Sequence, residues 1–222
     1  LWKLNMTPEQ WQIAMIKLIH KKGETSLINN YRPISLLISL FKTWERVLET
    51  RLRDQIEMSG MLANTQMGSR SELSTTQAML ATRLLVQHNK GRGTIYLAHI
   101  DLSKAYNRVN LDRLWAKLEK YGVNGSLLEC IKSTYSAQAE INSIGNQRSG
   151  AQRLERGLRQ GSVLSPLLFI IYMDDLLHEL NDGSRGLEWG NRRTAALMFV
   201  DDLQIMANSI DAIAQLLDLI IK

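Results

Sequence analysis

The stretch that decides the fold reads Leu197-Met198-Phe199-Val200-Asp201-Asp202-Leu203-Gln204-Ile205-Met206, an apolar run interrupted by two adjacent aspartates. Aspartate favours turns, so the run predicts two short strands joined around Asp201-Asp202. A second apolar, β-branched run at 94–102 predicts a buried strand that ends at Asp101. The sequence thus places carboxylates at the ends of two apolar strands.

Carboxylates gathered in one place repel one another, and this repulsion raises the pKa of each of them. A divalent cation removes this cost, and Mg²⁺ prefers oxygen ligands from one or two carboxylates together with substrate phosphates. Two such ions can assist an in-line phosphoryl displacement. A purely structural interpretation is also open, in which Asp201-Asp202 is a solvated turn and Asp101 caps the following helix.

The remaining pattern predicts an α+β fold, with helices alternating with hairpins. Strands are expected at 11–20 and 31–36 around a polar turn at 21–25, and hairpins are expected around 145–146 and 190–191. Three-to-four spacing of apolar residues predicts helices at 42–58, 74–88, 111–120, 126–136, 166–180 and 211–221.

Composition bounds the class of protein. The chain has 222 residues, 45% of them hydrophobic and 22% charged, which is ample for a core in one domain or in two lobes. A net charge of +5 suits a polyanionic partner without requiring one. The single cysteine, Cys130, excludes an internal disulfide and fits a reducing compartment. No stretch has the length of a membrane span or the layout of a signal peptide, so we expect a cytoplasmic or nuclear protein that is neither secreted nor membrane-bound.

Five segments along the chain form a recognisable series. They read Tyr31-Arg32-Pro33-Ile34-Ser35-Leu36-Leu37, Gln66-Met67-Gly68-Ser69-Arg70, Asp101-Leu102-Ser103-Lys104-Ala105-Tyr106-Asn107-Arg108-Val109, Gly157-Leu158-Arg159-Gln160-Gly161-Ser162 and Phe199-Val200-Asp201-Asp202. In this order they resemble the reverse transcriptase domain of LINE-type, non-LTR retrotransposons, over nearly the whole chain. Each segment alone is a weak signal, and their order carries the resemblance.

The resemblance implies the fingers and palm of a right-hand polymerase, with an antiparallel palm sheet packed on helices and no thumb. The fingers would lie mainly in 1–93 and the palm mainly in 94–222, with a crossover between them around 110–160. The chain begins at a leucine rather than a methionine and stops at Lys222 inside an apolar helical run, so we expect a fragment of a longer polypeptide.

The implied activity is RNA-directed DNA polymerisation, a nucleotidyl transfer that adds deoxynucleotides to a primer 3′-end with two Mg²⁺ ions, for which Mn²⁺ could substitute. Asp101, Asp201 and, less directly, Asp202 would be the catalytic and metal-binding residues, with the Leu102 carbonyl as a further ligand. The implied partners are an RNA template, a DNA primer, deoxynucleoside triphosphates, and the thumb and other domains of a parent polyprotein.

The resemblance also implies a nucleotide site next to the first aspartate. Backbone amides of Lys104 and Ala105 would lie under the triphosphate, and the Tyr106 ring would exclude a ribose 2′-hydroxyl. Tyr106 could instead be an ordinary core tyrosine. Tyrosine and Asn107 replace the usual phenylalanine-aspartate of the family, a change that keeps the ring and removes a charge outside the metal ligands.

Three further segments would contribute to the same pocket. Gln160 and Gly161 would line it, the glycine allowing close approach of the backbone. Lys21 or Lys22 and Arg32 would clamp the triphosphate from facing strands, although both lysines could equally form a solvated hairpin tip.

A last group of residues is expected near the template strand, namely Gln66, Gly68 and Arg70. Here Ser69 replaces the usual phenylalanine of the family, which makes template stacking at that position doubtful. Val200 replaces the commoner alanine between the aromatic residue and the aspartates, which adds bulk beside the metal.

Two other hypotheses remain. A degenerate, non-catalytic relative could use the same lobe only to bind RNA, but such decay would be expected to alter Asp101, Asp201 or Asp202, and all three are present. A group II intron maturase shares the catalytic segments, and the wording of the segment at 31–37 favours the retrotransposon side.

Overall fold

The computed structural model describes residues 1–144 and 147–221, and the chain forms two compact units. Unit 1 contains Leu1–Gly60 and Tyr106–Leu168, and unit 2 contains Met61–Ala105 and the segment from Phe169 onward. The expected crossover at 110–160 lies within unit 1, while 61–93 belong to unit 2. The labels fingers and palm describe function and stay predictions.

Unit 1 is built on a mixed sheet in the order β2-β1-β4-β5, with β6 also paired to β4. Strand β1 is antiparallel to β2, pairing His20 with Tyr31 and Met15 with Leu36, and it is parallel to β4. The strands are β1 (Ile13–His20), β2 (Tyr31–Leu36), β4 (Ala139–Ile144), β5 (Gln147–Arg148) and β6 (Gln152–Arg153).

The helices of unit 1 hold its core, because each buries one apolar stripe and leaves its polar side in solvent. Phe41, Leu48 and Leu52 are fully buried on α1, as are Leu114 and Leu118 on α3. These helices are α1 (Ser39–Ser59), α3 (Leu111–Lys120) and α4 (Gly125–Ser133), and they are accompanied by short 3-10 turns at Trp2–Leu4, Glu9–Gln12, Ile28–Asn30 and Tyr106–Arg108. Helix α5 (Ser165–Leu180) begins in unit 1 and continues in unit 2.

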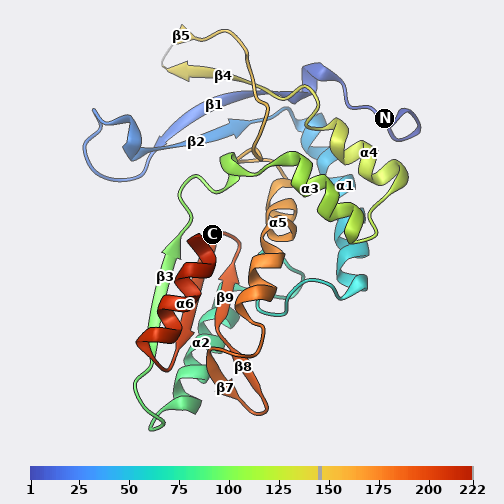
Figure 1. Ribbon diagram of the computed structural model, residues 1–222. Coiled ribbons are helices and arrows are strands. Elements are labelled where there is room, and N and C mark those ends of the chain that lie inside the picture. Colours follow the sequence, from blue (N-terminus) through green and yellow to red (C-terminus); the bar gives the residue numbers. More distant parts are fainter. Residues whose placement is uncertain (145–146, 222) are drawn as a thin grey trace. The chain divides into compact units, whose positions relative to one another are not determined.

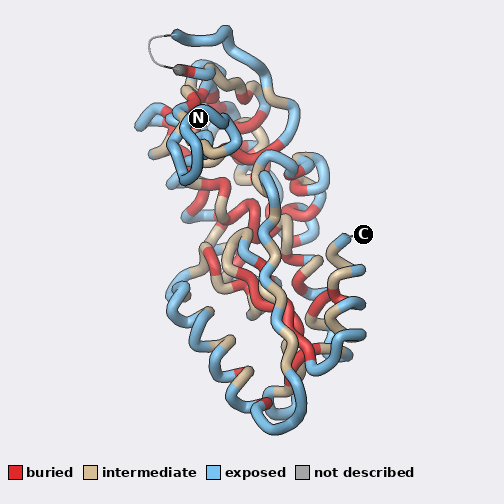
Figure 2. The backbone as a smooth tube through the Cα atoms, turned by 90° about the vertical axis from the view of Figure 1, so that its left-hand side faces the viewer, coloured by how far each residue is buried: buried red, intermediate tan, exposed pale blue. Residues whose placement is uncertain are grey.

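Unit 2 contains a three-stranded antiparallel sheet in the order β3-β10-β9. Its strands are β3 (Tyr96–Asp101), β9 (Ala196–Phe199) and β10 (Asp202–Ala207). Helix α2 (Thr75–Asn89) and helix α6 (Ile210–Ile221) lie on opposite faces of this sheet (Figure 1). Figure 2 shows buried residues along the sheet strands, and exposed residues along the outer sides of the two helices.

The face toward α2 can be identified from the alternation of side chains along the strands. Leu85 of α2 packs in one cluster with Leu197 of β9 and Met206 of β10, and Thr82 Oγ1 donates to Gln204 Oε1 at 2.7 Å. Residues two apart on a strand share a face. Asp202 therefore shares the α2 side of β10 with Gln204 and Met206.

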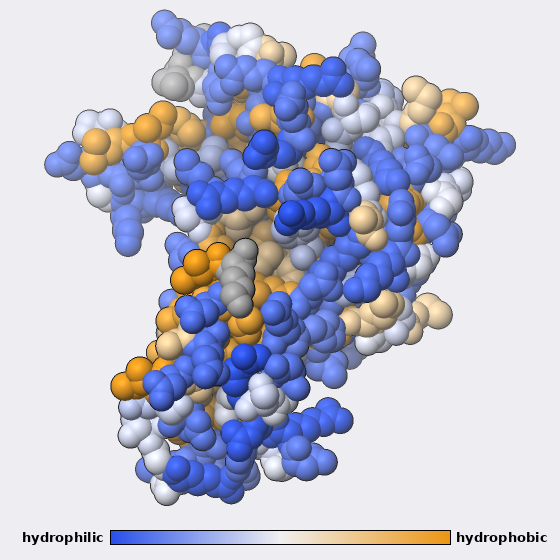
Figure 3. Space-filling view, viewed as in Figure 1, coloured by the Kyte–Doolittle hydropathy of each residue, from blue (hydrophilic) through white to orange (hydrophobic). Residues whose placement is uncertain are grey.

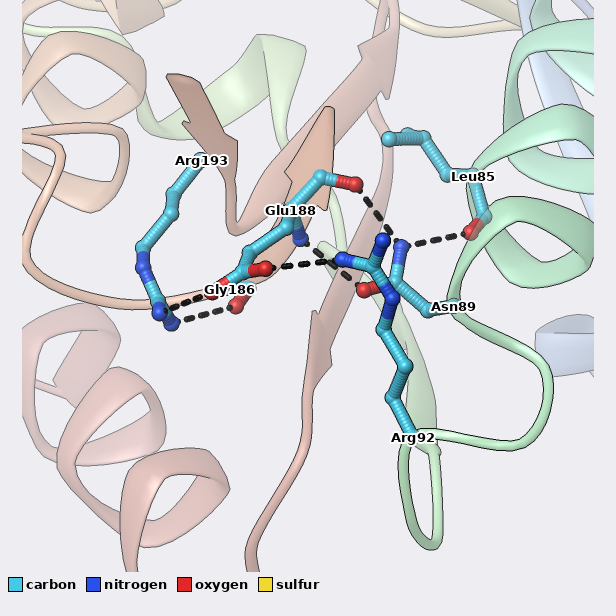
Figure 4. A network of polar contacts seen from close by, with 6 residues as sticks. All are labelled: Leu85, Asn89, Arg92, Gly186, Glu188 and Arg193. Carbon is cyan, nitrogen blue, oxygen red and sulfur yellow. Dashed lines mark hydrogen bonds and ion pairs between the residues drawn. The ribbon is translucent and has the colours of Figure 1, made fainter. Parts of the chain in front are cut away.

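A second hairpin, β7 (Leu187–Trp189) and β8 (Arg192–Thr194), is joined to α2 by buried polar contacts (Figure 4). The Asn89 amide donates to the Leu85 and Glu188 carbonyls at 2.8 Å and accepts from the Glu188 backbone N–H at 3.1 Å. The Glu188 carboxylate lies between the guanidinium groups of Arg92 and Arg193. Asn89 of α2 thus satisfies the backbone N–H and carbonyl of Glu188, and it supports a two-stranded hairpin of a kind that is only marginally stable alone.

Most of the predicted elements are confirmed with shifts of a few residues at their ends. The strand at 31–36, the helix at 111–120 and the hairpin around 190–191 lie where the pattern placed them. Ser74 caps α2 by accepting from the Gln77 backbone N–H, and Ser209 does the same for α6. Strands β4 and β5 pair as a hairpin, and the predicted turn at 145–146 lies outside the described residues. Within the described part of the chain, no helix is long and apolar enough to cross a membrane.

Candidate metal-binding site and nucleotide pocket

The structure pairs two of the three predicted catalytic aspartates directly. Asp101, the last residue of β3, lies opposite Asp202, the first residue of β10. Directly opposed residues of an antiparallel pair have Cβ atoms about 4.5–5.5 Å apart on the same face. Both residues are exposed, so their carboxylates share one solvent-facing edge of the sheet.

Asp201 lies in the turn between β9 and β10, where Phe199 pairs with Asp202 across a two-residue loop. The first loop residue, Val200, has φ +59°. Two-residue hairpin loops require a positive φ at this position, and glycine usually supplies it. A β-branched residue there is a conformational outlier. The site therefore contains a strained turn beside its carboxylates.

A cavity of about 340 Å³ opens beside this acidic pair, between α2 and the sheet. Asp101, Asp202 and Phe199 contribute to its wall, together with Met79 and Thr82 of α2. Its remaining lining residues are Ala78, His99, Ile100, Leu197, Met198, Leu203 and Gln204. The cavity has the size of a small-ligand pocket, with apolar walls and a few polar groups.

The oxygen donors fit a hard divalent cation. Among the described residues, no three carboxylate, imidazole or thiol side chains converge on a single point. Asp101 and Asp202 are paired, and Asp201 is adjacent in the turn. A Mg²⁺ ion commonly takes one or two carboxylates and completes its shell with water and phosphate oxygens, so the pair offers what such an ion needs from protein.

The segment after β3 turns sharply. The Ala105 backbone N–H donates to the Leu102 carbonyl at 3.1 Å, and Lys104 adopts φ +53°. A carbonyl oxygen has two lone pairs, so this hydrogen bond leaves the Leu102 carbonyl able to bind a cation. Lys104 is exposed, so its side chain is accessible to a phosphate.

Residues predicted to approach the template lie in unit 2 beside the aspartate turn. The Gln66 side chain is buried, with 1% exposed, and its Oε1 accepts from the backbone N–H groups of Gly68 and Val200. Arg70 donates to the Ala63 carbonyl at 3.2 Å. The structure thus shows Gln66 bonded to the protein's own backbone, and a template contact for these residues stays a prediction.

In unit 1 the predicted nucleotide residues Tyr106, Gln160 and Gly161 belong to connected segments. The Leu158 backbone N–H donates to the Tyr106 carbonyl at 2.8 Å. The Gln160 carbonyl accepts from the Ser35 backbone N–H at 2.8 Å, and a Cβ on Gly161 would lie 2.6 Å from the Ser35 carbonyl oxygen. Gly161, at φ +113°, therefore permits both the turn and its close approach to β2. Tyr106 is half-buried, so it is neither a full core residue nor a solvated one.

A buried charged network supports this turn. Glu45 on α1 is fully buried, and its carboxylate accepts from Ser162 Oγ at 2.6 Å and from the Val163 backbone N–H at 3.0 Å. Arg159, 2% exposed, donates to the carbonyls of Thr134 and Gln12. Its guanidinium also lies over the rings of Phe41 and Tyr135, 5.4 and 5.2 Å from their centroids.

Burial dominates the protonation of this network. It raises the pKa of Glu45 despite the hydrogen bonds from Ser162 and Val163, and it lowers the pKa of Arg159. Burial, with the nearby Glu45 charge, raises the pKa of Tyr135 to about 12. The sequence analysis missed Glu45, although a glutamate within the apolar stripe of α1, next to Trp44 and Leu48, was a visible signal.

The predicted triphosphate clamp lies at the β1-β2 end of unit 1. Lys21, Lys22 and Arg32 are all exposed, and the Lys21 backbone N–H donates to the Asn30 carbonyl at 2.8 Å. Their side chains are accessible to a phosphate, and their role stays a prediction.

The antiparallel sheet presents paired carboxylates beside a ligand-sized cavity, an arrangement that a metal-dependent phosphoryl transfer could use. The chain belongs to the reverse transcriptase (RNA-dependent DNA polymerase) family, which matches residues 19–222. The resemblance to non-LTR retrotransposon reverse transcriptases is thereby confirmed.

Relatives carry the same description. The chain is 34% identical over 182 residues, 78% of its length, to a probable RNA-directed DNA polymerase from transposon BS of Drosophila melanogaster. It is 28% identical, over 98% of its length, to the Pol polyprotein of the type-2 retrotransposable element R2DM of the same species. It covers 19% and 20% of these two proteins, so it spans about a fifth of the curated relatives it matches.

Solved structures agree on the fold. A telomerase from Candida albicans, in complex with a fragment of telomeric RNA, matches 100% of the chain and 41% of its own with a TM-score of 0.68 at 14% identity. An apo telomerase from Candida tropicalis matches 96% of the chain and 47% of its own with a TM-score of 0.65 at 18% identity. At this identity the likeness shows a shared polymerase fold and no more.

The raised pKa of Glu45 predicts a pH-dependent contribution to stability. The folded state holds the Glu45 proton more tightly than the unfolded chain, so protonation favours folding. The resulting stabilisation is full below the unfolded value of about 4.5, and it is lost as pH rises through the raised folded value. We expect Glu45→Ala to lower the free energy of unfolding more at pH 4.5 than at pH 8, measured by urea denaturation of the chain.

Ser162→Ala provides the control. The Ser162 hydroxyl lowers the pKa of Glu45, so its removal should extend the window of Glu45 stabilisation to higher pH. A Glu45→Ala penalty that grew as pH rose would show that the ionised carboxylate, rather than the protonated one, stabilises the fold.

Proposed function

We propose that the chain is the fingers and palm part of an RNA-directed DNA polymerase of a retroelement, which adds deoxynucleotides to a primer 3′-end on an RNA template. The pairing of Asp101 with Asp202 on one exposed edge carries this proposal, because it supplies the carboxylates that a metal-dependent nucleotidyl transfer requires. Membership of the reverse transcriptase family supports the choice of reaction.

Asp101 and Asp202 would hold divalent cations with help from Asp201 and the Leu102 carbonyl. Mg²⁺ is the preferred ion on the basis of the oxygen donors, and Mn²⁺ would substitute. When bound, the metal lowers the pKa of an attacking hydroxyl and neutralises charge on the phosphates. The chain's own contribution is to fix two carboxylates by strand pairing, so that little reorganisation is needed when substrate arrives.

The cavity beside the aspartates supports placement of a substrate there. Phe199 and Met79 line it next to the carboxylates, so a sugar or base could pack on apolar walls while its phosphates reached the metal. Lys21, Lys22, Arg32 and the turn at Lys104-Ala105 would bind the triphosphate, and Arg70 with its neighbouring segment would approach the template.

Gln160 would contact the nucleotide in the same proposal. Its Oε1 is buried, and within the described chain it accepts no hydrogen bond. Buried acceptors are normally satisfied, and an orphaned one is often explained by a ligand or a water. Gln160 thus has an acceptor available for a donor on a bound nucleotide.

The remaining parts of a larger polyprotein are further proposed partners. Apolar side chains gather over α6 in Figure 3, where Ile210 is 64% and Ile221 81% exposed. Apolar residues exposed to this extent on one helix support packing by another segment. We place the protein inside the cell, in the cytoplasm or the nucleus, where its nucleic-acid partners are.

The direct test is primer extension on an RNA template with Mg²⁺, using the full-length polypeptide that carries this chain. Asp101→Asn should lower kcat by at least about 100-fold, since the metal supplies several kcal/mol of transition-state stabilisation. Asp218→Asn, which removes an exposed carboxylate on α6, should leave extension unchanged. RNA binding without extension by the unsubstituted protein would favour the alternative of a non-catalytic scaffold.

Tyr106 is the residue proposed to exclude a ribose 2′-hydroxyl, and it would do so by steric clash. Tyr106→Phe keeps the ring and should preserve the preference for deoxynucleotides. Tyr106→Ala should weaken this preference by about 30- to 1,000-fold, which corresponds to about 2–4 kcal/mol. The measurement is the ratio of kcat/KM for deoxy- and ribonucleotides, and unchanged selectivity in Tyr106→Ala would assign Tyr106 to the core instead.

A further inference from the structure

The turn that carries Asp201 is strained at Val200. Val200 has φ +59°, in a region where β-branched residues are outliers. Residues persist in such regions only where their surroundings impose the conformation. Something in unit 2 must therefore hold this turn.

The Gln66 side chain is the group in the right place. Its Oε1 accepts from the Val200 backbone N–H at 3.1 Å and from the Gly68 backbone N–H at 2.9 Å. The first of these bonds fixes the plane of the Phe199–Val200 peptide, and the side chain is only 1% exposed. Water cannot compete for a buried acceptor, so the bond is stronger than it would be at the surface.

The backbone around Gln66 approaches the turn as closely as atoms allow. A Cβ on Gly68 would lie 2.3 Å from Val200 N and 2.6 Å from Val200 Cγ2. Real Cβ atoms do not come this close to backbone. Gly68 is therefore glycine because the Val200 backbone occupies the space of a side chain.

The segment of Gln66 is itself anchored along β9. The Met67 N–H donates to the Met198 carbonyl at 2.8 Å, and the Met198 N–H donates to the Thr65 carbonyl at 2.9 Å. Gln66 and Met198 form a parallel bridge. This isolated bridge fixes the position of the segment along β9 and sets the Gln66 carboxamide beside the turn.

Asp174 of α5 and Asn181, the residue that follows α5, hold the segment of Gln66 as well. Asn181 donates to Thr65 Oγ1 at 3.1 Å and accepts from the Ala195 and Ala196 backbone N–H groups of the β9 end. Asp174, 1% exposed, accepts from the Ala63 N–H at 2.9 Å. A chain of buried and part-buried hydrogen bonds therefore runs from the end of α5 through the Gln66 segment to Val200.

We infer that Gln66 is a positioning residue for catalysis, which holds the Val200–Asp201 turn in its strained conformation so that Asp201 remains beside the Asp101–Asp202 pair. It acts through the Val200 peptide and does not touch substrate or metal. The inference rests on the proposed polymerase function, and it gives Gln66 a role apart from the template contact predicted from its sequence segment.

Strain supplies a specific test, because glycine adopts a positive φ without cost. Gln66→Met removes the acceptor and keeps the side-chain length. In the Val200 protein it should lower kcat about tenfold, which corresponds to about 1.4 kcal/mol, with little change in KM. In a Val200→Gly background the same substitution should lower kcat less than threefold.

Primer extension by the four proteins of this double-mutant cycle measures the coupling between the two positions. An equal loss from Gln66→Met in both backgrounds would overturn the inference, because a role in packing alone does not depend on the φ of residue 200. Gly68→Ala should lower kcat in both backgrounds, since its Cβ meets the backbone N of residue 200 whichever side chain is present. Gly150→Ala, at a position with open space and no positive φ, is the matched control.

Amide hydrogen exchange in the chain itself gives a readout independent of polymerisation. Gln66→Met should accelerate exchange of the Val200 and Gly68 amides at least tenfold, while the amides of Leu203 and Ile205 in β10 keep their protection. Unchanged exchange at Val200 would overturn the inference even if the enzyme were active. If the unsubstituted protein failed to extend a primer while hydrogen exchange changed as expected, the proposed function would be contradicted. The structural role of Gln66 at the Val200 turn would still be supported.

Discussion

The register between β3 and β10 is the constraint on which the site depends. Asp101 lies opposite Asp202, and the pairing continues through Ile100 with Leu203 to Tyr96 with Ala207. A slip of one residue would send alternate side chains to the opposite face. It would separate the two carboxylates and expose Leu203 and Ile205, which are buried. The apolar residues of β10 therefore protect the geometry of the acidic pair.

Within each unit, buried polar groups stabilise the backbone next to candidate functional residues. In unit 2, Gln66 and Asn181 satisfy backbone groups at the turn and at the start of β9. In unit 1, Glu45 does the same for the backbone that follows Gln160 and Gly161. Removing one member of such a network leaves its partners buried and unsatisfied. The turn at Val200 thus contacts the buried Gln66 side chain, and the turn after Gly161 contacts the buried Glu45 side chain. Burying these polar groups costs stability, and their hydrogen bonds restrict the backbone conformation of the turns.

Sequence pattern predicted the elements better than the contacts between them. Alternation and turn residues placed β2, α3 and the β7-β8 hairpin, because local spacing determines such elements. The same reasoning put the turn at Asp201-Asp202, whereas the structure begins β10 at Asp202 and places Val200 in the loop. No local signal predicts a valine at positive φ, since the contacts that hold it come from residues 134 positions away.

The acidic pair and the supporting side chains show the same limit. The family resemblance identified Asp101, Asp201 and Asp202, but the pairing of Asp101 with Asp202 follows from strand register, which the sequence alone left open. Gln66 was expected at the template, whereas in the structure its side chain is buried and its Oε1 accepts from the backbone N–H groups of Gly68 and Val200. The units likewise combine distant segments, 61–105 with 169 onward, through long-range packing that no local pattern contains.

The proposed function requires that the carboxylates at the end of β3 and at the start of β10 bind a divalent metal ion. Paramagnetic broadening of backbone amide signals by Mn²⁺, recorded on the chain with a deoxynucleoside triphosphate present, tests it most directly. If these carboxylates bind the ion, broadening should be strongest at residues 100–102 and 201–203. It should be lost in an Asp101→Asn, Asp202→Asn double variant. Broadening centred elsewhere, or equal broadening in that variant, would contradict metal binding by these carboxylates.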